Sequence, residues 1–148
     1  MNKVAMITGA TRNTGFAIAH RFAQNGYDVV VTSRDQHNAD EAVLQLKKEF
    51  PENRFLALGM NQEEAQAIHS GFEKIRDAFD RLDVFVGNAA DLAVDCDVFN
   101  TSLERWNQVI ATNVTGNFLC AQESAKLMKD GGSIVFISSV HANQSIVG

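Results

Sequence analysis

Short apolar runs alternate along the chain with longer stretches in which apolar residues recur every three or four positions. The short runs predict strands at residues 4–8, 28–33, 54–58, 83–87 and 133–137. Several of these runs are apolar almost throughout instead of alternating with polar residues, which is typical of strands buried on both faces of a parallel sheet.

Helices are expected between these strands, over residues 15–25, 38–50 and 65–79 and from residue 101 toward residue 128. Asn38 is the expected N-cap of the second helix, and Thr101 with Glu104 forms a capping box at the start of the fourth. Strands that alternate with helices of this length favour right-handed β-α-β units. The prediction is an α/β fold: one domain over residues 1–148, with a doubly wound parallel sheet in a three-layer α/β/α arrangement.

Composition narrows the class of protein. The chain has 148 residues, of which 45% are hydrophobic and 21% charged, as expected of a folded domain. The 13 basic and 18 acidic residues give a net charge of −5 without a basic run, so neither nucleic acid nor an anionic membrane is an expected partner. The two cysteines, Cys96 and Cys120, form no C-x-x-C pair and indicate a reduced, cytoplasmic protein.

A loop of small residues leads from the first predicted strand directly into a helix. Small residues allow the backbone to approach a pyrophosphate, and the N–H groups and dipole of the helix favour an anion. An ordinary tight turn between a strand and a helix is the alternative interpretation. The candidate cofactor-binding residues in this loop are Gly9, Thr11, Arg12, Asn13, Thr14 and Gly15.

The end of the second predicted strand bears on the choice of cofactor. Ser33 lies 24 residues after Gly9, near the position at which an NAD-binding site places an acidic residue on the ribose 2′-hydroxyl. Arg34 follows it, and a guanidinium group matches a 2′-phosphate in charge and geometry. Arg12 could reach the same phosphate. Each arginine alone is as well explained as a solvated surface charge, but the two together favour NADP(H).

The fourth predicted strand is followed by Asn88, Ala89 and Ala90. Small residues at this point allow a flat cofactor to lie against the backbone, and Asn88 can tie neighbouring loops together. A structural Asx turn explains the same residues. On the fourth helix, Asn113 interrupts the apolar stripe, so its amide must be satisfied by backbone, by water or by a reacting group.

The fifth predicted strand ends in Ser138 and Ser139, and His141 follows. No G-x-S-x-G turn surrounds either serine, which argues against a serine nucleophile. His141 is a candidate for lining a substrate pocket, although a surface histidine is the more common case.

Together these motifs resemble the short-chain dehydrogenase/reductase family over essentially the whole chain. The resemblance rests on Thr8-Gly9-x-x-x-Asn13-x-Gly15, Asn88-Ala89-Ala90, Trp106 through Asn113-x-x-Gly116, and Gly132-Ser133-Ile134-Val135-x-Ile137-Ser138-Ser139. It implies that the glycine-loop residues pack against the cofactor, that Asn113 holds a water of the proton relay, and that Ser139 hydrogen-bonds the substrate carbonyl. It also implies a homodimer or homotetramer for the full-length protein.

The chain departs from the family pattern at several positions. Asn13 stands for the middle glycine, and Ala90 for the last residue of the Asn-Ala-Gly turn. Gly59 stands where the family usually has an acidic residue, and the following Met60 is expected to cover the adenine. The general acid of the family is the tyrosine of a Tyr-x-x-x-Lys segment, which would begin just past residue 148, and the single tyrosine, Tyr27, aligns with nothing catalytic.

The resemblance therefore predicts an NADP(H)-dependent oxidoreductase acting on a carbonyl or alcohol substrate, with this 148-residue chain itself inactive. A sensor or interaction module that binds NADP without turnover is the alternative. A flavin or S-adenosylmethionine binder is less consistent, since neither cofactor explains Asn113 together with Ser139.

Overall fold

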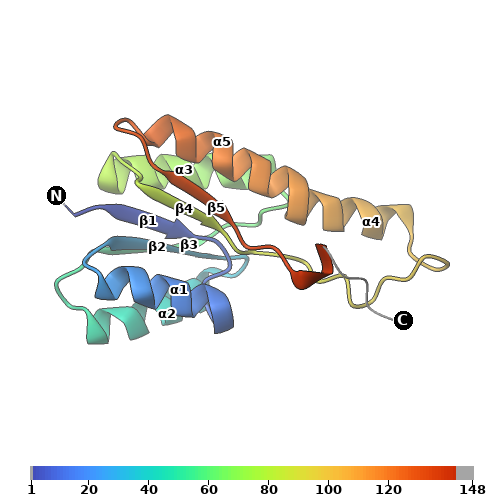
Figure 1. Ribbon diagram of the computed structural model, residues 1–148, viewed down its shortest axis with the longest axis horizontal. Helices are drawn as coiled ribbons and strands as arrows, with labels where there is room; N and C mark the ends of the chain where they lie inside the picture. Colours follow the sequence, from blue (N-terminus) through green and yellow to red (C-terminus); the bar gives the residue numbers. More distant parts are fainter. Residues whose placement is uncertain (1, 143–148) are drawn as a thin grey trace.

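A five-stranded, all-parallel sheet with helices on both faces forms the protein (Figure 1). The computed structural model describes residues 2–142. Its elements are β1 (Val4–Ile7), α1 (Asn13–Gln24), β2 (Asp28–Ser33), α2 (Gln36–Glu49), β3 (Phe55–Gly59), α3 (Ala65–Phe79), β4 (Val84–Gly87), α4 (Leu103–Ile110), the π-helical segment η1 (Ala111–Gly116), α5 (Asn117–Leu127), β5 (Ser133–Phe136) and the 3-10 turn η2 (Val140–Ala142). The predicted α/β fold is confirmed.

The strand order β3-β2-β1-β4-β5 fixes where a ligand can bind. The chain runs outward from the central β1 to β3 and then returns to the other side of β1 as β4. The loops that follow β1 and β4 therefore diverge at a topological switch point, which is where open parallel sheets bind ligands.

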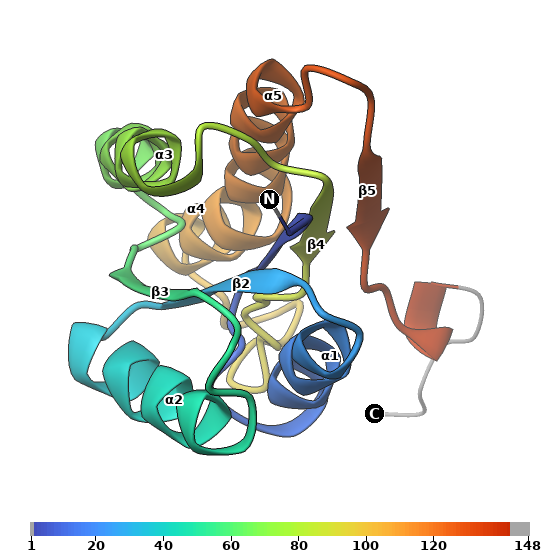
Figure 2. The same ribbon diagram turned by 90° about the vertical axis from the view of Figure 1, so that its left-hand side faces the viewer.

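Two apolar cores lie on opposite faces of the sheet, and Figure 2 shows the helices that cover each face. Met6 and Val30 face the layer formed by α3 and α5, whereas Ile7 and Val31 face α1 and α2. Successive strand residues point to opposite faces. The continuous apolar runs of β1 and β2 are thus explained by burial on both sides.

Two predicted helix starts were wrong. The N-cap of α2 is Asp35 rather than Asn38, and its carboxylate accepts a hydrogen bond from the Asn38 N–H at 3.3 Å. The N-cap of α4 is Ser102 rather than Thr101, because the Thr101 hydroxyl donates to the carbonyl of Asp97 in the preceding loop. The fourth predicted helix is also divided, since η1 separates α4 from α5.

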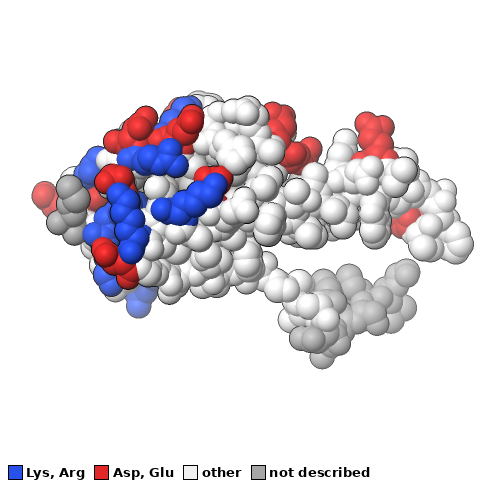
Figure 3. Space-filling view, turned by 90° about the horizontal axis from the view of Figure 1, so that it is seen from above, with Lys and Arg blue, Asp and Glu red and all other residues white. Residues whose placement is uncertain are grey.

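Several large apolar residues are not covered by the described chain. All four residues of β5, the last strand of the sheet, are exposed, as are Trp106 and Phe118 on the helices α4 and α5. On the face that carries α3 and α5, charged side chains gather at the end where the strands begin, and the surface over α4 is mostly uncharged (Figure 3). Within residues 2–142, no helix combines the length and the apolar character that a membrane span requires.

Candidate functional site

The loops that follow β1 and β4 are joined by side-chain hydrogen bonds. The Asn88 amide donates to the carbonyls of Thr8 and Gly9 at 2.9 and 3.2 Å. In return, the Thr8 hydroxyl oxygen accepts from the N–H groups of Asn88 and Ala89, both at 3.0 Å. Asn88 and Thr8 therefore hold the two loops in one arrangement at the switch point.

The glycine loop requires small residues because its backbone packs against this junction. A Cβ atom at Gly15 would lie 2.4 Å from the Gly9 carbonyl oxygen and 2.5 Å from the Asn88 amide nitrogen. Gly9 has a φ of 62°, and its Cβ would lie 3.0 Å from Cα of Ala89. A side chain at either position would push the two loops apart, so both glycines are required for this geometry.

The first turn of α1 has the properties of an anion site. Its N-cap, Arg12, makes no side-chain hydrogen bond to the turn, and the turn contains no acidic residue. Its N–H groups and the positive end of the helix dipole are thus left for another acceptor. Asn13 occupies the left-handed region with a φ of 48°, a conformation that asparagine adopts more readily than most residues. The turn therefore survives the replacement of the family glycine, and a pyrophosphate fits this end of the helix.

Two exposed arginines follow the strands β1 and β2. Ser33 ends β2, and its carbonyl accepts from the Met60 N–H at 2.7 Å, which joins the exits of β2 and β3. Arg34 and Arg12 are exposed, and neither forms an ion pair within residues 2–142. Both guanidinium groups therefore remain available to an added anion.

At the exit of β3, the residue expected to cover the adenine, Met60, packs inward. Met60 is only 2% exposed, and its sulfur lies against Gly71 of α3. Its side chain is part of the core, and the expected contact of Met60 with the adenine stays a prediction. Gly59 is exposed, and its N–H donates to the Gln36 side chain at 2.6 Å. Gln36, which the sequence did not single out, therefore lies beside the position of the family's missing acid.

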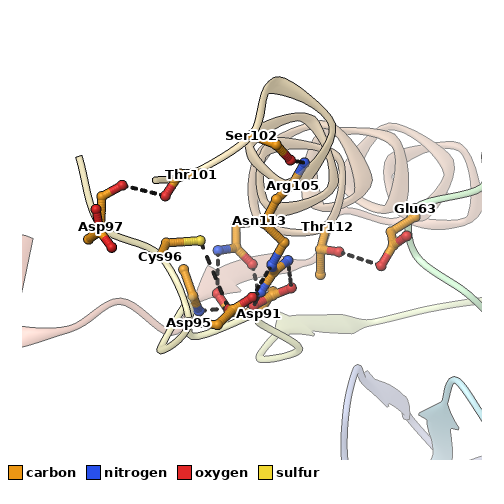
Figure 4. Close-up of polar contacts among 11 residues, drawn as sticks. Glu63, Asp91, Asp95, Cys96, Asp97, Thr101, Ser102, Arg105, Thr112 and Asn113 are labelled. Atoms are coloured by element: carbon orange, nitrogen blue, oxygen red, sulfur yellow. Dashed lines mark hydrogen bonds and ion pairs between the residues drawn. The ribbon is translucent and has the colours of Figure 1, made fainter. Parts of the chain in front are cut away.

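Asn113 binds the loop after β4 through both the oxygen and the nitrogen of its side-chain amide (Figure 4). Its oxygen accepts from the Asp91 N–H at 2.8 Å, and its nitrogen donates to the Asp91 carbonyl at 2.8 Å. The sequence left backbone, water or a reacting group as the partner of this amide, and the structure shows the backbone of Asp91. Asn113 thus fixes the chain directly after Ala90.

A charged cluster holds the same loop through a second residue of this helical stretch. The Arg105 guanidinium binds the Asp91 carboxylate at 2.6 and 2.8 Å and the Asp95 carboxylate at 2.7 and 2.8 Å (Figure 4). Hydrogen bonds from Arg105, and then one from the Ala93 N–H, lower the pKa of Asp91 to about 2, and the charge of Arg34 contributes. The Arg105 hydrogen bonds also lower the pKa of Asp95. All three groups are therefore ionised at neutral pH.

The exit of β5 lies next to that of β4, because the two strands are paired. Ser138 and Ser139 are both exposed there, and the Ser139 carbonyl accepts from the Ala142 N–H at 3.0 Å. His141 belongs to η2, but its side chain lies outside the described part of the structure. The structure thus places the candidate serine in the segment that directly follows the strand paired with β4.

Sequence reasoning missed Gln36 and Arg105, and it did not identify the roles of Thr8 and Asp91 in holding the loops together. Thr8 carried a usable signal, since a hydroxyl at the end of a buried strand needs a partner. Asp91 and Arg105 carried none, because they lie 14 residues apart on a loop and a helix.

Comparison with known proteins agrees with this geometry. The family model for short chain dehydrogenase matches residues 3–148. The chain is 36% identical over 142 residues to an uncharacterised oxidoreductase of Escherichia coli, covering 93% of this chain and 57% of that protein. It is 30% identical over 138 residues to a 3α-hydroxysteroid dehydrogenase of Mediterraneibacter gnavus, covering 93% and 55%.

Among solved structures, a short chain dehydrogenase from Burkholderia cenocepacia in complex with NADP is similar with a TM-score of 0.90 and 26% identity. The match covers 98% of this chain and 58% of that one. The chain thus spans a little more than half the length of these relatives. Since the family model matches nearly every residue, the chain belongs to the short chain dehydrogenase family.

Proposed function

We propose that the full-length protein is an NADP(H)-dependent oxidoreductase that transfers hydride between the nicotinamide and a carbonyl or alcohol substrate. The observation that carries this proposal is the exit of β2, where Ser33 and the exposed Arg34 stand in place of an acidic residue. An acid at that position would repel a 2′-phosphate, whereas a guanidinium attracts it. The related structure from Burkholderia cenocepacia was solved with NADP, which supports this choice.

The residues of this chain fit such a cofactor. The uncapped first turn of α1 would receive the pyrophosphate, and Gly9 and Gly15 keep that approach open. Arg34 and Arg12 would hold the 2′-phosphate. The backbone of Asn88–Ala90, fixed by Thr8 and Asn113, would form the floor beneath the nicotinamide side. When bound, the cofactor supplies or accepts the hydride.

The reacting groups of the protein would then lie at the exits of β4 and β5. Ser139 would donate a hydrogen bond to the substrate oxygen and so favour charge developing on it. Asn113 would hold the loop that borders the substrate and contribute to the proton path. The tyrosine and lysine of the family motif are expected after residue 148, in the part of the relatives' length that this chain does not span.

Turnover by the full-length protein tests the proposal. We expect it to oxidise NADPH in the presence of at least one member of a panel of ketones and aldehydes, and to use NADH less well. Ser139→Ala should lose most of kcat with little change in cofactor affinity, whereas the matched Ser138→Ala should retain it. Tight NADP binding without turnover on any carbonyl or alcohol would contradict the proposed reaction and indicate a binding protein.

A further inference from the structure

Two side-chain amides bind consecutive carbonyls of the π-helical segment η1. Gln62, in the loop after β3, donates from Nε2 to the Thr112 carbonyl at 3.1 Å. Asn117, the first residue of α5, donates from Nδ2 to the Asn113 carbonyl at 2.9 Å. The backbone departs from the α-helical pattern here: an α-helix would join the Asn113 carbonyl to the backbone N–H of Asn117, but that N–H bonds to the Val114 carbonyl instead.

The same two residues carry an energetic cost. The amide oxygens of Gln62 and Asn117 are buried and have no hydrogen-bond partner within residues 2–142. Gln62 is only 4% exposed. A buried acceptor without a partner destabilises a fold, so each orphaned oxygen offsets part of the stability that the hydrogen bond of the same amide contributes. Polar residues that oppose stability in this way are typical of functional positions.

Both amides are held by close packing. A Cβ at Gly116 would lie 2.3 Å from the Gln62 carbonyl oxygen, so the loop after β3 is pressed against the end of η1. A Cβ at Gly87 would lie 2.5 Å from the Asn117 amide oxygen. Gly87 directly precedes Asn88, so Asn117 lies against the strand end that carries the proposed cofactor turn. The two amides thus connect η1 to the exits of β3 and β4.

We propose that Gln62 and Asn117 are positioning residues that keep η1 in its π-helical form and thereby place Asn113 on the backbone of Asp91. The inference rests on the proposed function for its consequence in catalysis. A π-helical turn contains more residues than an α-helical one, so its loss would rotate Asn113 about the helix axis. The Asn113 amide would then leave the two Asp91 backbone groups that it now binds at 2.8 Å.

Hydrogen exchange at a single amide tests the placement of Asn113 in the full-length protein, whether or not a substrate is known. The variants are Asn117→Leu and Gln62→Met, which remove the amide and keep a similar shape. The matched control is Ser124→Ala, which removes the third unpartnered buried oxygen, on α5, without touching η1. We expect the Asp91 N–H, measured by NMR, to exchange about three- to tenfold faster in both variants and unchanged in the control, as for the loss of one hydrogen bond.

Melting temperature and kinetics separate positioning from a role in folding. Ser124→Ala removes only a buried unpartnered oxygen and should melt at or above the wild-type temperature. Asn117→Leu and Gln62→Met also remove a hydrogen bond to a carbonyl of η1, so the two effects offset and both variants should melt close to the wild-type temperature. With a substrate, kcat of Asn117→Leu and Gln62→Met should fall about tenfold while KM for NADPH stays within about twofold.

Unchanged Asp91 exchange in both variants would overturn the inference. So would a lower melting temperature with faster exchange throughout α5, since the amides would then support only the fold. Absence of turnover by the wild-type protein would instead contradict the proposed function, and the exchange result would still decide the placement of Asn113.

Discussion

Replacing Arg105 by glutamine should remove stability that depends on the ionised Asp91 carboxylate. Hydrogen bonds from Arg105 and then from Ala93 lower the pKa of Asp91 from 3.8 to about 2. A group whose pKa is lower in the folded state stabilises the fold above its unfolded pKa and loses that contribution as the pH falls through the folded value. The contribution of Asp91 is thus complete above about pH 5 and is lost between about pH 4 and pH 2.

The size of this loss of stability follows from the pKa shift of Asp91 and from the exposed fractions of the Asp91 and Arg105 side chains. A displacement from 3.8 to about 2 corresponds to roughly 2 kcal/mol at about 1.4 kcal/mol per pKa unit. The Asp91 side chain is 23% exposed and that of Arg105 24%, so solvent screening reduces the expected value to about 1–2 kcal/mol. The Ala93 hydrogen bond remains in the variant and retains part of the shift.

Urea unfolding of the full-length protein at a series of pH values measures this contribution. Arg105→Gln should be less stable than wild type by about 1–2 kcal/mol near neutral pH, and the difference should shrink toward about pH 2. Lys129→Gln is the matched control, because Lys129 binds the exposed Asp80 at 2.8 Å and such pairs contribute little. A difference for Arg105→Gln that is the same at neutral and acid pH would refute the reasoning, since the Asp91 charge would then play no part.

Two further predictions concern the cofactor loop and the extent of the chain. Gly15→Ala should abolish most NADPH binding and lower the free energy of unfolding by about 1–3 kcal/mol, because its Cβ would lie 2.4 Å from the Gly9 carbonyl oxygen. Fluorescence titration measures the loss of binding, and urea unfolding measures the loss of stability. Residues 1–148 expressed alone should turn over carbonyl substrates at least about a hundredfold more slowly than the full-length protein, because the general acid of the family lies outside them. Comparable rates for the two forms would show that another group protonates the substrate.

The fold was predictable because its signal is local. Strands buried on both faces, such as β1, consist of apolar residues alone, and no other arrangement explains several such runs separated by amphipathic helices. The exposure of β5 and of Trp106 was not predictable. The spacing of apolar residues along the sequence is the same whether or not another part of the described chain covers them, so it does not report their exposure.

The site was predictable only where it depends on single strand exits. The sequence identified Gly9, Gly15 and Asn88 because each lies shortly after the end of β1 or β4. The bond between Asn113 and Asp91, and the pairing of Asp91 with Arg105, depend on how a loop folds back on a helix, which no periodicity records. The packing of Met60 in the core was not predictable, because one apolar residue at a strand exit can face either a ligand or the core.

The central claim is that this sheet edge binds NADP(H) through Arg34. Calorimetry on the full-length protein tests it most directly, with dissociation constants for NADP and NAD measured on wild type and on the double variant Ser33→Asp/Arg34→Ala. A charge-assisted contact worth about 1.5–3 kcal/mol predicts a preference of about ten- to a hundredfold for NADP in the wild type. The double variant, with an acid restored and the cation removed, should prefer NAD. Equal binding of NAD and NADP by the wild-type protein would contradict the claim, because Arg34 would then point into solvent.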